Sequence, residues 1–143
     1  MNPPAQPPAK MKRKMPQTTN KYSLAEARFM MGWGCFAREV YATGKASGFY
    51  DVPYFRKGFN HEQKLLLMVS EICEGMEGAR GAPWPGIADD KLPHRPMLEV
   101  ELADTVIRIM NYASHCGLDV QGAIIEKNKF NATRGHKHGG KRF

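Results

Sequence analysis

The chain has 143 residues, which is enough for one domain with a real core but too few for a second full domain. Its formal charge of +7 is unevenly distributed. Residues 1–21 hold five Lys/Arg and residues 127–143 hold six, with no acid in either segment, whereas residues 22–126 have a balance of −4. No stretch is apolar over the ~18 residues that a membrane span requires, so we expect a soluble protein without a membrane partner.

The first 21 residues are rich in Pro, Lys and polar side chains and contain no apolar run of signal-peptide length. Such a composition cannot bury enough apolar surface to become ordered. We therefore predict a disordered, flexible basic tail over 1–21 and a single helical domain over 22–143. A basic tail can contact RNA, DNA or another partner, but a solvated extension that aids solubility is the favoured interpretation.

The first predicted helix begins at Ser23, because Ser23 and Glu26 have the spacing of a capping box. We expect it to end near Thr43, where Gly44 follows. Residues 44–59 have no sustained period and are predicted to form a long loop. Residues at helical spacing along the first helix are expected to form core contacts: Phe29, Trp33, Phe36 and Val40.

The second predicted helix follows Asn60, which can act as an N-cap with Gln63 in the box position. It is expected to run for about 18 residues, to Ala79, because apolar side chains recur at helical spacing over this range. Its apolar stripe, which we expect to be buried, comprises Leu65, Leu66, Val69, Ile72, Cys73 and Met76.

The third predicted helix runs from about Pro96, with proline in its first turn, to Cys116, and Gly117 is its C-terminal stop. Asp119 can cap a fourth helix over 120–134. The connection is so short that these two helices should lie antiparallel. No window alternates with period two, so the class is all-α and we expect a four-helix bundle. The stripe of the third helix is Leu98, Leu102, Val106, Ile109, Met110 and Ala113.

The cysteines indicate the cellular compartment of the protein. Cys35, Cys73 and Cys116 are an odd number, and each falls within a helical pattern rather than at a crossing of loops. This placement suits reduced thiols, so we expect a cytoplasmic protein.

Two pairs of carboxylates stand out on the second and third predicted helices. Residues three apart project from nearly the same face of a helix, so Glu71 and Glu74 form one acidic patch, and Glu77 continues it around the helix. Glu101 and Asp104 form a second pair at the same spacing. Like charges at this separation repel each other and weaken an isolated helix, so something must compensate for the repulsion.

A solvated face with Lys or Arg partners is the simplest compensation, but the second helix has no Lys or Arg between Lys64 and Arg80. If the two pairs face each other, four carboxylates converge, and Mg²⁺, or alternatively Mn²⁺, would neutralise them with oxygen ligands. The di-iron pattern needs Glu-x-x-His, which is absent here. The predicted metal ligands are Glu71, Glu74, Glu101 and Asp104.

The same residues carry a resemblance to a known family. Glu71-x-x-Glu74, then 26 residues, then Glu101-x-x-Asp104, followed by EKNKFNATRGHKHGGK, resembles the MazG-like branch of the all-α nucleoside triphosphate pyrophosphatases. The resemblance covers roughly residues 60–143. The Pro-rich segment GAPWPGIADDKLPHRP between the acidic helices departs from a minimal version of the pattern.

The resemblance implies magnesium-dependent cleavage between the α and β phosphates of a (deoxy)nucleoside triphosphate, giving the monophosphate and pyrophosphate. Such an enzyme would control or clean the nucleotide pool. Proteins similar to this one assemble as dimers or tetramers, so a homo-oligomer is expected. Glu77 is a weaker candidate, either for a ligand or for a base that orients water, and a surface role is the alternative.

The fourth predicted helix carries Lys127, Asn131 and Arg134 on one face. The resemblance implies that they bind the triphosphate and sugar, the cations offsetting phosphate charge and the amide donating directed hydrogen bonds. A basic last turn that complements the helix dipole would explain the cations but not the intervening Asn. His136 and His138 suggest a transition-metal site only weakly, because no third ligand accompanies them.

The sequence leaves two other functions open. One is a basic-tailed nucleic-acid-binding or regulatory helical protein whose acidic pairs are structural. The other is an alarmone hydrolase that acts on a guanosine polyphosphate. The preferred base cannot be read from the sequence, because every base can stack on the aromatic candidates Trp33, Trp84, Phe49, Tyr50 and Tyr54.

Overall fold

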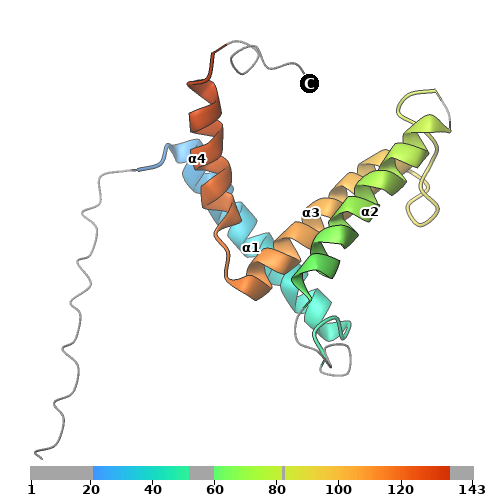
Figure 1. The fold of residues 1–143 in the computed structure, drawn as a ribbon, viewed down its shortest axis with the longest axis horizontal. Coiled ribbons are helices and arrows are strands. Elements are labelled where there is room, and N and C mark those ends of the chain that lie inside the picture. The colour runs from blue at the N-terminus through green and yellow to red at the C-terminus, as the bar shows by residue number, and fades with distance from the viewer. Residues whose placement is uncertain (1–20, 52–59, 82, 136–143) are drawn as a thin grey trace, which may run out of the picture.

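The computed structural model describes residues 21–51, 60–81 and 83–135. In these ranges the regular structure is helical, apart from an isolated bridge between Ala88 and Pro96, so the predicted all-α class is confirmed. Figure 1 shows the second and third helices side by side in one arm of the molecule, whereas the fourth helix lies beside the first. The four helices are α1 (Leu24–Ala46), α2 (His61–Arg80), α3 (Met97–Cys116) and α4 (Val120–Ala132).

The caps predicted for the first two helices are present. The Ser23 hydroxyl accepts a hydrogen bond from the Glu26 N–H at 3.2 Å, and the Glu26 carboxylate accepts one from the Ser23 N–H at 2.7 Å. Asn60 Oδ1 accepts a hydrogen bond from the Gln63 N–H at 2.8 Å. Because caps satisfy N–H groups that have no partner inside the helix, they fix where α1 and α2 begin.

The ends of α3 and α4 also follow local signals. Pro96 is the N-cap of α3 and so lies just before the first turn, one residue earlier than predicted. Gly117 ends α3 in the left-handed conformation, with φ of 67°, as a glycine at that position can. Asp119 Oδ1 accepts a hydrogen bond from the Gly122 N–H at 2.9 Å and starts α4.

The predicted end of α1 at Gly44 is wrong, because α1 continues to Ala46. Gly44 is buried inside the helix, and a Cβ added to it would lie 2.7 Å from Nδ2 of Asn111 on α3. Because glycine has no side chain, α1 and α3 can approach each other closely at this position. The turn comes later, at Gly48, whose φ is 77°.

The buried apolar core is small and lies between α1 and α3. It consists of Ala37, Val40 and Met110, with Trp33 and Ile107 packed against it. The prediction of core aromatics on α1 is therefore only partly right. The side chains that it placed wrongly in the core are half-exposed: Phe29 and Phe36.

The predicted burial of the apolar stripe of α2 is wrong. This helix packs against α3 and buries Glu71, Gly75 and Gly78 there. The two glycines let the helices approach closely, since a Cβ at Gly78 would lie 2.9 Å from the side chain of Met97. The members of the stripe are exposed: Leu65, Leu66, Val69, Ile72, Cys73 and Met76. On α3, Leu102 and Val106 are exposed too, while Met110 and Ala113 are buried.

The predicted antiparallel pairing of α4 with α3 is also wrong, because α4 packs against α1 (Figure 1). Two ion pairs join α4 to α1 and to the residues just before it. Lys129 Nζ lies 3.0 Å from a Glu26 carboxylate oxygen, and Lys21 Nζ lies 2.6 Å from Glu126 Oε1. Lys21 is the last residue of the predicted tail, and the rest of that tail lies outside the described residues, as do 52–59, His136 and His138.

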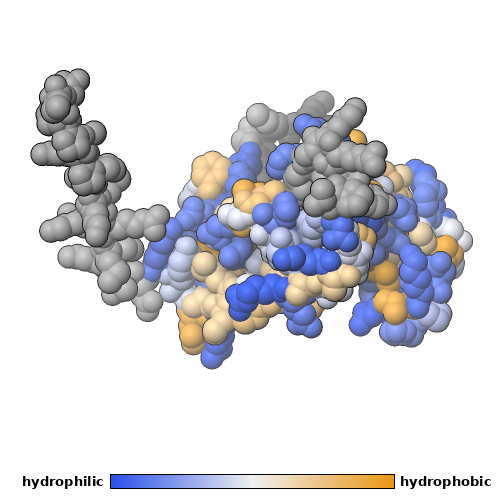
Figure 2. All heavy atoms as spheres, turned by 90° about the horizontal axis from the view of Figure 1, so that it is seen from below, coloured by the Kyte–Doolittle hydropathy of each residue, from blue (hydrophilic) through white to orange (hydrophobic). Residues whose placement is uncertain are grey.

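The surface of the described chain is mixed in character. Figure 2 shows hydrophobic residues reaching the surface in several places between hydrophilic ones. All three cysteines are free, in agreement with the expected reduced thiols. Among the helices of the ranges above, none combines the length and apolar character that crossing a membrane requires.

Candidate functional site

Three carboxylates meet where α2 and α3 run side by side. Glu71 comes from α2, and Glu101 and Asp104 come from α3, and their ligand oxygens all lie within 4.8 Å of one another. Glu71 is 5% exposed and Glu101 is 3% exposed. Gly75 makes the approach possible, because a Cβ there would lie 3.2 Å from the Cβ of Glu101. We call these three residues the acidic cluster.

The electrostatics of the acidic cluster are those of crowded negative charges. Burial, a hydrogen bond with Glu71 and the charges of Glu74, Glu71 and Asp104 together raise the pKa of Glu101 to about 7, and burial is the largest of these causes. Burial of like-charged carboxylates costs free energy unless a cation or a proton compensates for it. Hard oxygen donors in this number suit Mg²⁺ or Mn²⁺, so the residues present are compatible with the predicted ion.

The acidic cluster contains three of the four predicted metal ligands. Glu74 is exposed and lies outside the group of three, although its charge still acts on Glu101. Glu77 is exposed and forms an ion pair with Arg80 at 2.7 Å. The structure therefore places Glu77 on the surface, which was the alternative to a role in the site.

The residues predicted to bind the triphosphate lie elsewhere. Lys127, Asn131 and Arg134 are exposed on α4 or just after it. Lys127 Nζ lies 4.8 Å from the ring centroid of Phe130, and Lys127 and Asn131 line a shallow hollow on α4 itself. Because α4 packs against α1 and diverges from the α2–α3 arm, the structure does not bring these residues to the acidic cluster (Figure 1).

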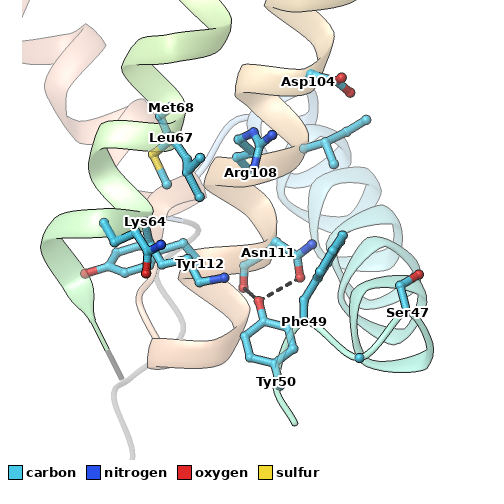
Figure 3. A pocket seen from close by; sticks show the side chains of 13 residues that line it. Ser47, Phe49, Tyr50, Lys64, Leu67, Met68, Asp104, Arg108, Asn111 and Tyr112 are labelled. Atoms are coloured by element: carbon cyan, nitrogen blue, oxygen red, sulfur yellow. Dashed lines mark hydrogen bonds between the residues drawn. The ribbon is translucent and has the colours of Figure 1, made fainter. Parts of the chain in front are cut away.

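A pocket of about 500 Å³ adjoins the acidic cluster, and Asp104 belongs to the cluster and also lines the pocket. Its walls come from the turn after α1 and from the facing sides of α2 and α3 (Figure 3). The turn contributes Phe49 and Tyr50, which were candidates for stacking on a base. Lys64 comes from α2 and Arg108 from α3.

The polar end of the pocket farthest from Asp104 is held by a hydrogen bond. The Tyr50 hydroxyl donates to Asn111 Oδ1 at 2.9 Å (Figure 3). Burial raises the pKa of Tyr50 to about 12, so its hydroxyl stays a hydrogen-bond donor even in mildly alkaline solution. The other aromatic candidates are placed differently. Trp33 packs against the core, Trp84 is 81% exposed, and Tyr54 lies outside the described residues.

Sequence reasoning missed Lys64, Arg108 and Asn111 as site residues. A signal was available, because Lys64 precedes Glu71 by seven residues and Arg108 and Asn111 follow Asp104 by four and seven. These spacings repeat on one helix face, so each of the three shares a face with a carboxylate of the cluster.

Comparisons with protein-family models, with curated proteins and with solved structures found no match to this chain. The site consists of three carboxylates, of which Glu71 and Glu101 are buried and Asp104 is half-buried, and of an adjoining pocket with cations and aromatic side chains.

Proposed function

We propose that this protein is a metal-dependent nucleoside triphosphate pyrophosphohydrolase of the MazG-like kind, which releases the monophosphate and pyrophosphate. Magnesium is the expected ion and manganese the alternative. The observation that carries the proposal is the acidic cluster, with oxygens within 4.8 Å of one another, at the edge of a pocket large enough for a nucleoside. The spacing of the two acidic pairs in the sequence supports the same family.

Glu71, Glu101 and Asp104 would hold the ion, which when bound offsets phosphate charge and makes a water more acidic. Asp104 lies at the boundary between the cluster and the pocket, so a ligand in the pocket has its phosphates beside the carboxylates. Glu74 is exposed near the cluster and is the carboxylate left to accept the proton of the attacking water. The Tyr50–Asn111 pair then faces the nucleoside end.

A pyrophosphate-release screen over all ribo- and deoxynucleoside triphosphates, with Mg²⁺ present, tests this function. The wild-type protein should release pyrophosphate from at least one of them, and Asp104→Asn should not. Binding to DNA or RNA that weakens with salt, with no pyrophosphate released from any triphosphate, would favour a nucleic-acid-binding protein instead. Adding a guanosine polyphosphate to the screen tests the alarmone alternative.

A homo-oligomer is part of the same proposal. The exposed stripe of α2 is continuous along the helix, and apolar patches of this kind on small proteins mark interfaces. A second copy of the chain would cover this stripe and would also give the exposed residues of α4 a role. Because Lys127, Asn131 and Arg134 do not reach the acidic cluster of their own chain, they would serve the cluster of a partner. The free cysteines support the cytoplasmic location predicted from the sequence.

A further inference from the structure

Arg108 has a hydrogen-bonding group that the protein leaves unused. Its Nη2 lies 2.5 Å from Glu71 Oε1, which joins α3 to α2 across the edge of the acidic cluster. Its Nε is buried and has no hydrogen-bond partner among the described residues. A buried donor on a charged group is costly to leave without an acceptor, so such a group indicates a ligand that supplies one.

A second cation lies on the same pocket. Lys64 comes from α2, and Figure 3 shows Lys64 and Arg108 on the pocket wall, with Asp104 one turn away from Arg108. Burial, and after it the charge of Arg108, lowers the pKa of Lys64. The Lys64 ammonium therefore lies close enough to the guanidinium to be repelled by it. An anion in the pocket would relieve this repulsion.

We propose that Lys64 and Arg108 form the phosphate subsite of this pocket and bind the polyphosphate of the ligand beside Asp104. This inference rests on the proposed function, because it assumes that phosphates and the acidic cluster must meet. The guanidinium can keep Nη2 on Glu71 while a different nitrogen, Nε, donates its N–H to a phosphate oxygen, and an ammonium has only one nitrogen for both contacts. Lys64 adds a point charge from the opposite helix.

This assignment differs from the one that the sequence suggested. Lys127 and Arg134 lie on the α4 side of the molecule, whereas Lys64 and Arg108 belong to the two helices that carry the acidic cluster. Binding of phosphate therefore begins within one chain. The α4 cations of a partner copy would add to a subsite that is already present.

The test uses inorganic tripolyphosphate as the probe, titrated calorimetrically into the full chain at saturating Mn²⁺. Arg108→Gln and Lys64→Gln should each weaken its binding by about tenfold or more, as expected for loss of a charge-assisted contact. Arg108→Lys should restore only part of the affinity, since it keeps the charge but loses the Nε–H. The matched control is Arg28→Ala, which removes an exposed cation on α1 and should change nothing.

Two further readouts separate the possible failures. Mn²⁺ affinity, measured without phosphate, should be kept or increased in Arg108→Gln, because the cation beside Glu71 is gone. If tripolyphosphate binding is unchanged in both Gln variants while nucleotide binding falls, Arg108 reads the nucleoside and the inference is wrong. If binding depends on both cations but no triphosphate is hydrolysed, the subsite stands and the proposed hydrolase activity fails.

Discussion

Gly75 on α2 lies directly against Glu101 on α3, so that a Cβ at residue 75 would be 3.2 Å from the Glu101 Cβ. Contact at this distance requires the neighbour to move by a few tenths of an ångström. We predict that Gly75→Ala weakens Mn²⁺ binding several-fold, because Glu101 must move away from its two partner carboxylates. Mn²⁺ titration of the two proteins measures this directly.

Gly32→Ala is the matched control, because nothing lies within 4 Å of a Cβ at Gly32 in the middle of α1. Both substitutions gain helix propensity, by up to about 1 kcal/mol. Only Gly32→Ala should show that gain in denaturant unfolding without any change in Mn²⁺ affinity. Equal stabilisation in both variants, with Mn²⁺ affinity unchanged in both, would show that the close contact has no bearing on the site.

The pH dependence of stability follows from Glu101. Its pKa rises from an ordinary 4.5 to about 7 in the folded protein, mainly because of burial, so the folded state holds this proton more tightly than the unfolded state. The resulting stabilisation is complete below pH 4.5 and is lost as the pH rises to about 7. Metal-free wild-type protein should therefore lose stability across this window, by up to about 3 kcal/mol from this group.

The side chain introduced in Glu101→Gln cannot ionise, so this variant should lack the part of the pH dependence of stability that comes from Glu101. In EDTA it should unfold at higher denaturant than wild type at pH 8, with a smaller difference at pH 4.5. Denaturant unfolding of both proteins at a series of pH values provides the comparison. Parallel curves over the whole range would mean that Glu101 ionises normally in the fold.

Asp104 and Glu74 should not be equivalent. Asp104 belongs to the acidic cluster, whereas Glu74 is exposed beside it. We predict that Asp104→Ala abolishes both Mn²⁺ binding and hydrolysis, while Glu74→Ala retains most of the metal affinity and loses turnover. Both variants should stay folded without metal, since each loses a repelling charge. A large fall of the metal-free melting temperature in both, with turnover retained, would make the acids structural.

The sequence predicted those features of the fold that depend on neighbouring residues. The Ser23–Glu26 box and the Asn60 and Asp119 caps are local, and they fixed where three helices begin. Gly44 shows the limit of such signals. The sequence does not distinguish a glycine that ends a helix from one that makes room for a side chain of another helix. Gly44 is of the second kind, because the side chain of Asn111 lies against it.

Burial could not be predicted in the same way, because an apolar stripe does not specify what covers it. The stripe of α2 was expected to be buried, but small and acidic residues occupy the contact of α2 with α3. The acidic cluster was predictable from the repeated spacing of carboxylates. The position of Arg108, four residues after Asp104, places it on the same helix face, but its pairing with Glu71 depends on how α2 and α3 meet, which the spacing does not specify.

The α2 stripe leads to a prediction about assembly. Wild-type protein should have a mass above the 16.1 kDa of one chain in light scattering. Ile72→Glu should shift it toward the monomer, because a charge would be buried at the interface. Leu118→Glu is the control, since Leu118 has the same 51% exposure as Ile72 but lies between α3 and α4. A 16.1 kDa particle in active samples would rule out the oligomer.

Mixing variants tests whether α4 acts on a partner. Asp104→Asn keeps α4 intact, and Lys127→Ala with Arg134→Ala keeps the acidic cluster intact. If each site combines the cluster of one copy with α4 of another, co-refolding the two inactive proteins should restore part of the activity. Failure of the mixture, with each protein still able to form oligomers, would show that the α4 residues have no role in a partner's site.

The oxygen of the attacking water shows which phosphorus is attacked. Triphosphate hydrolysis is run in H₂¹⁸O with Mg²⁺, and the products are examined by ³¹P NMR. Attack at the α-phosphorus beside the acidic cluster predicts that the label appears in the nucleoside monophosphate and that the pyrophosphate is unlabelled. Release of inorganic phosphate and a nucleoside diphosphate, or turnover that persists in Asp104→Asn, would show that the acidic cluster does not direct water to the α-phosphorus.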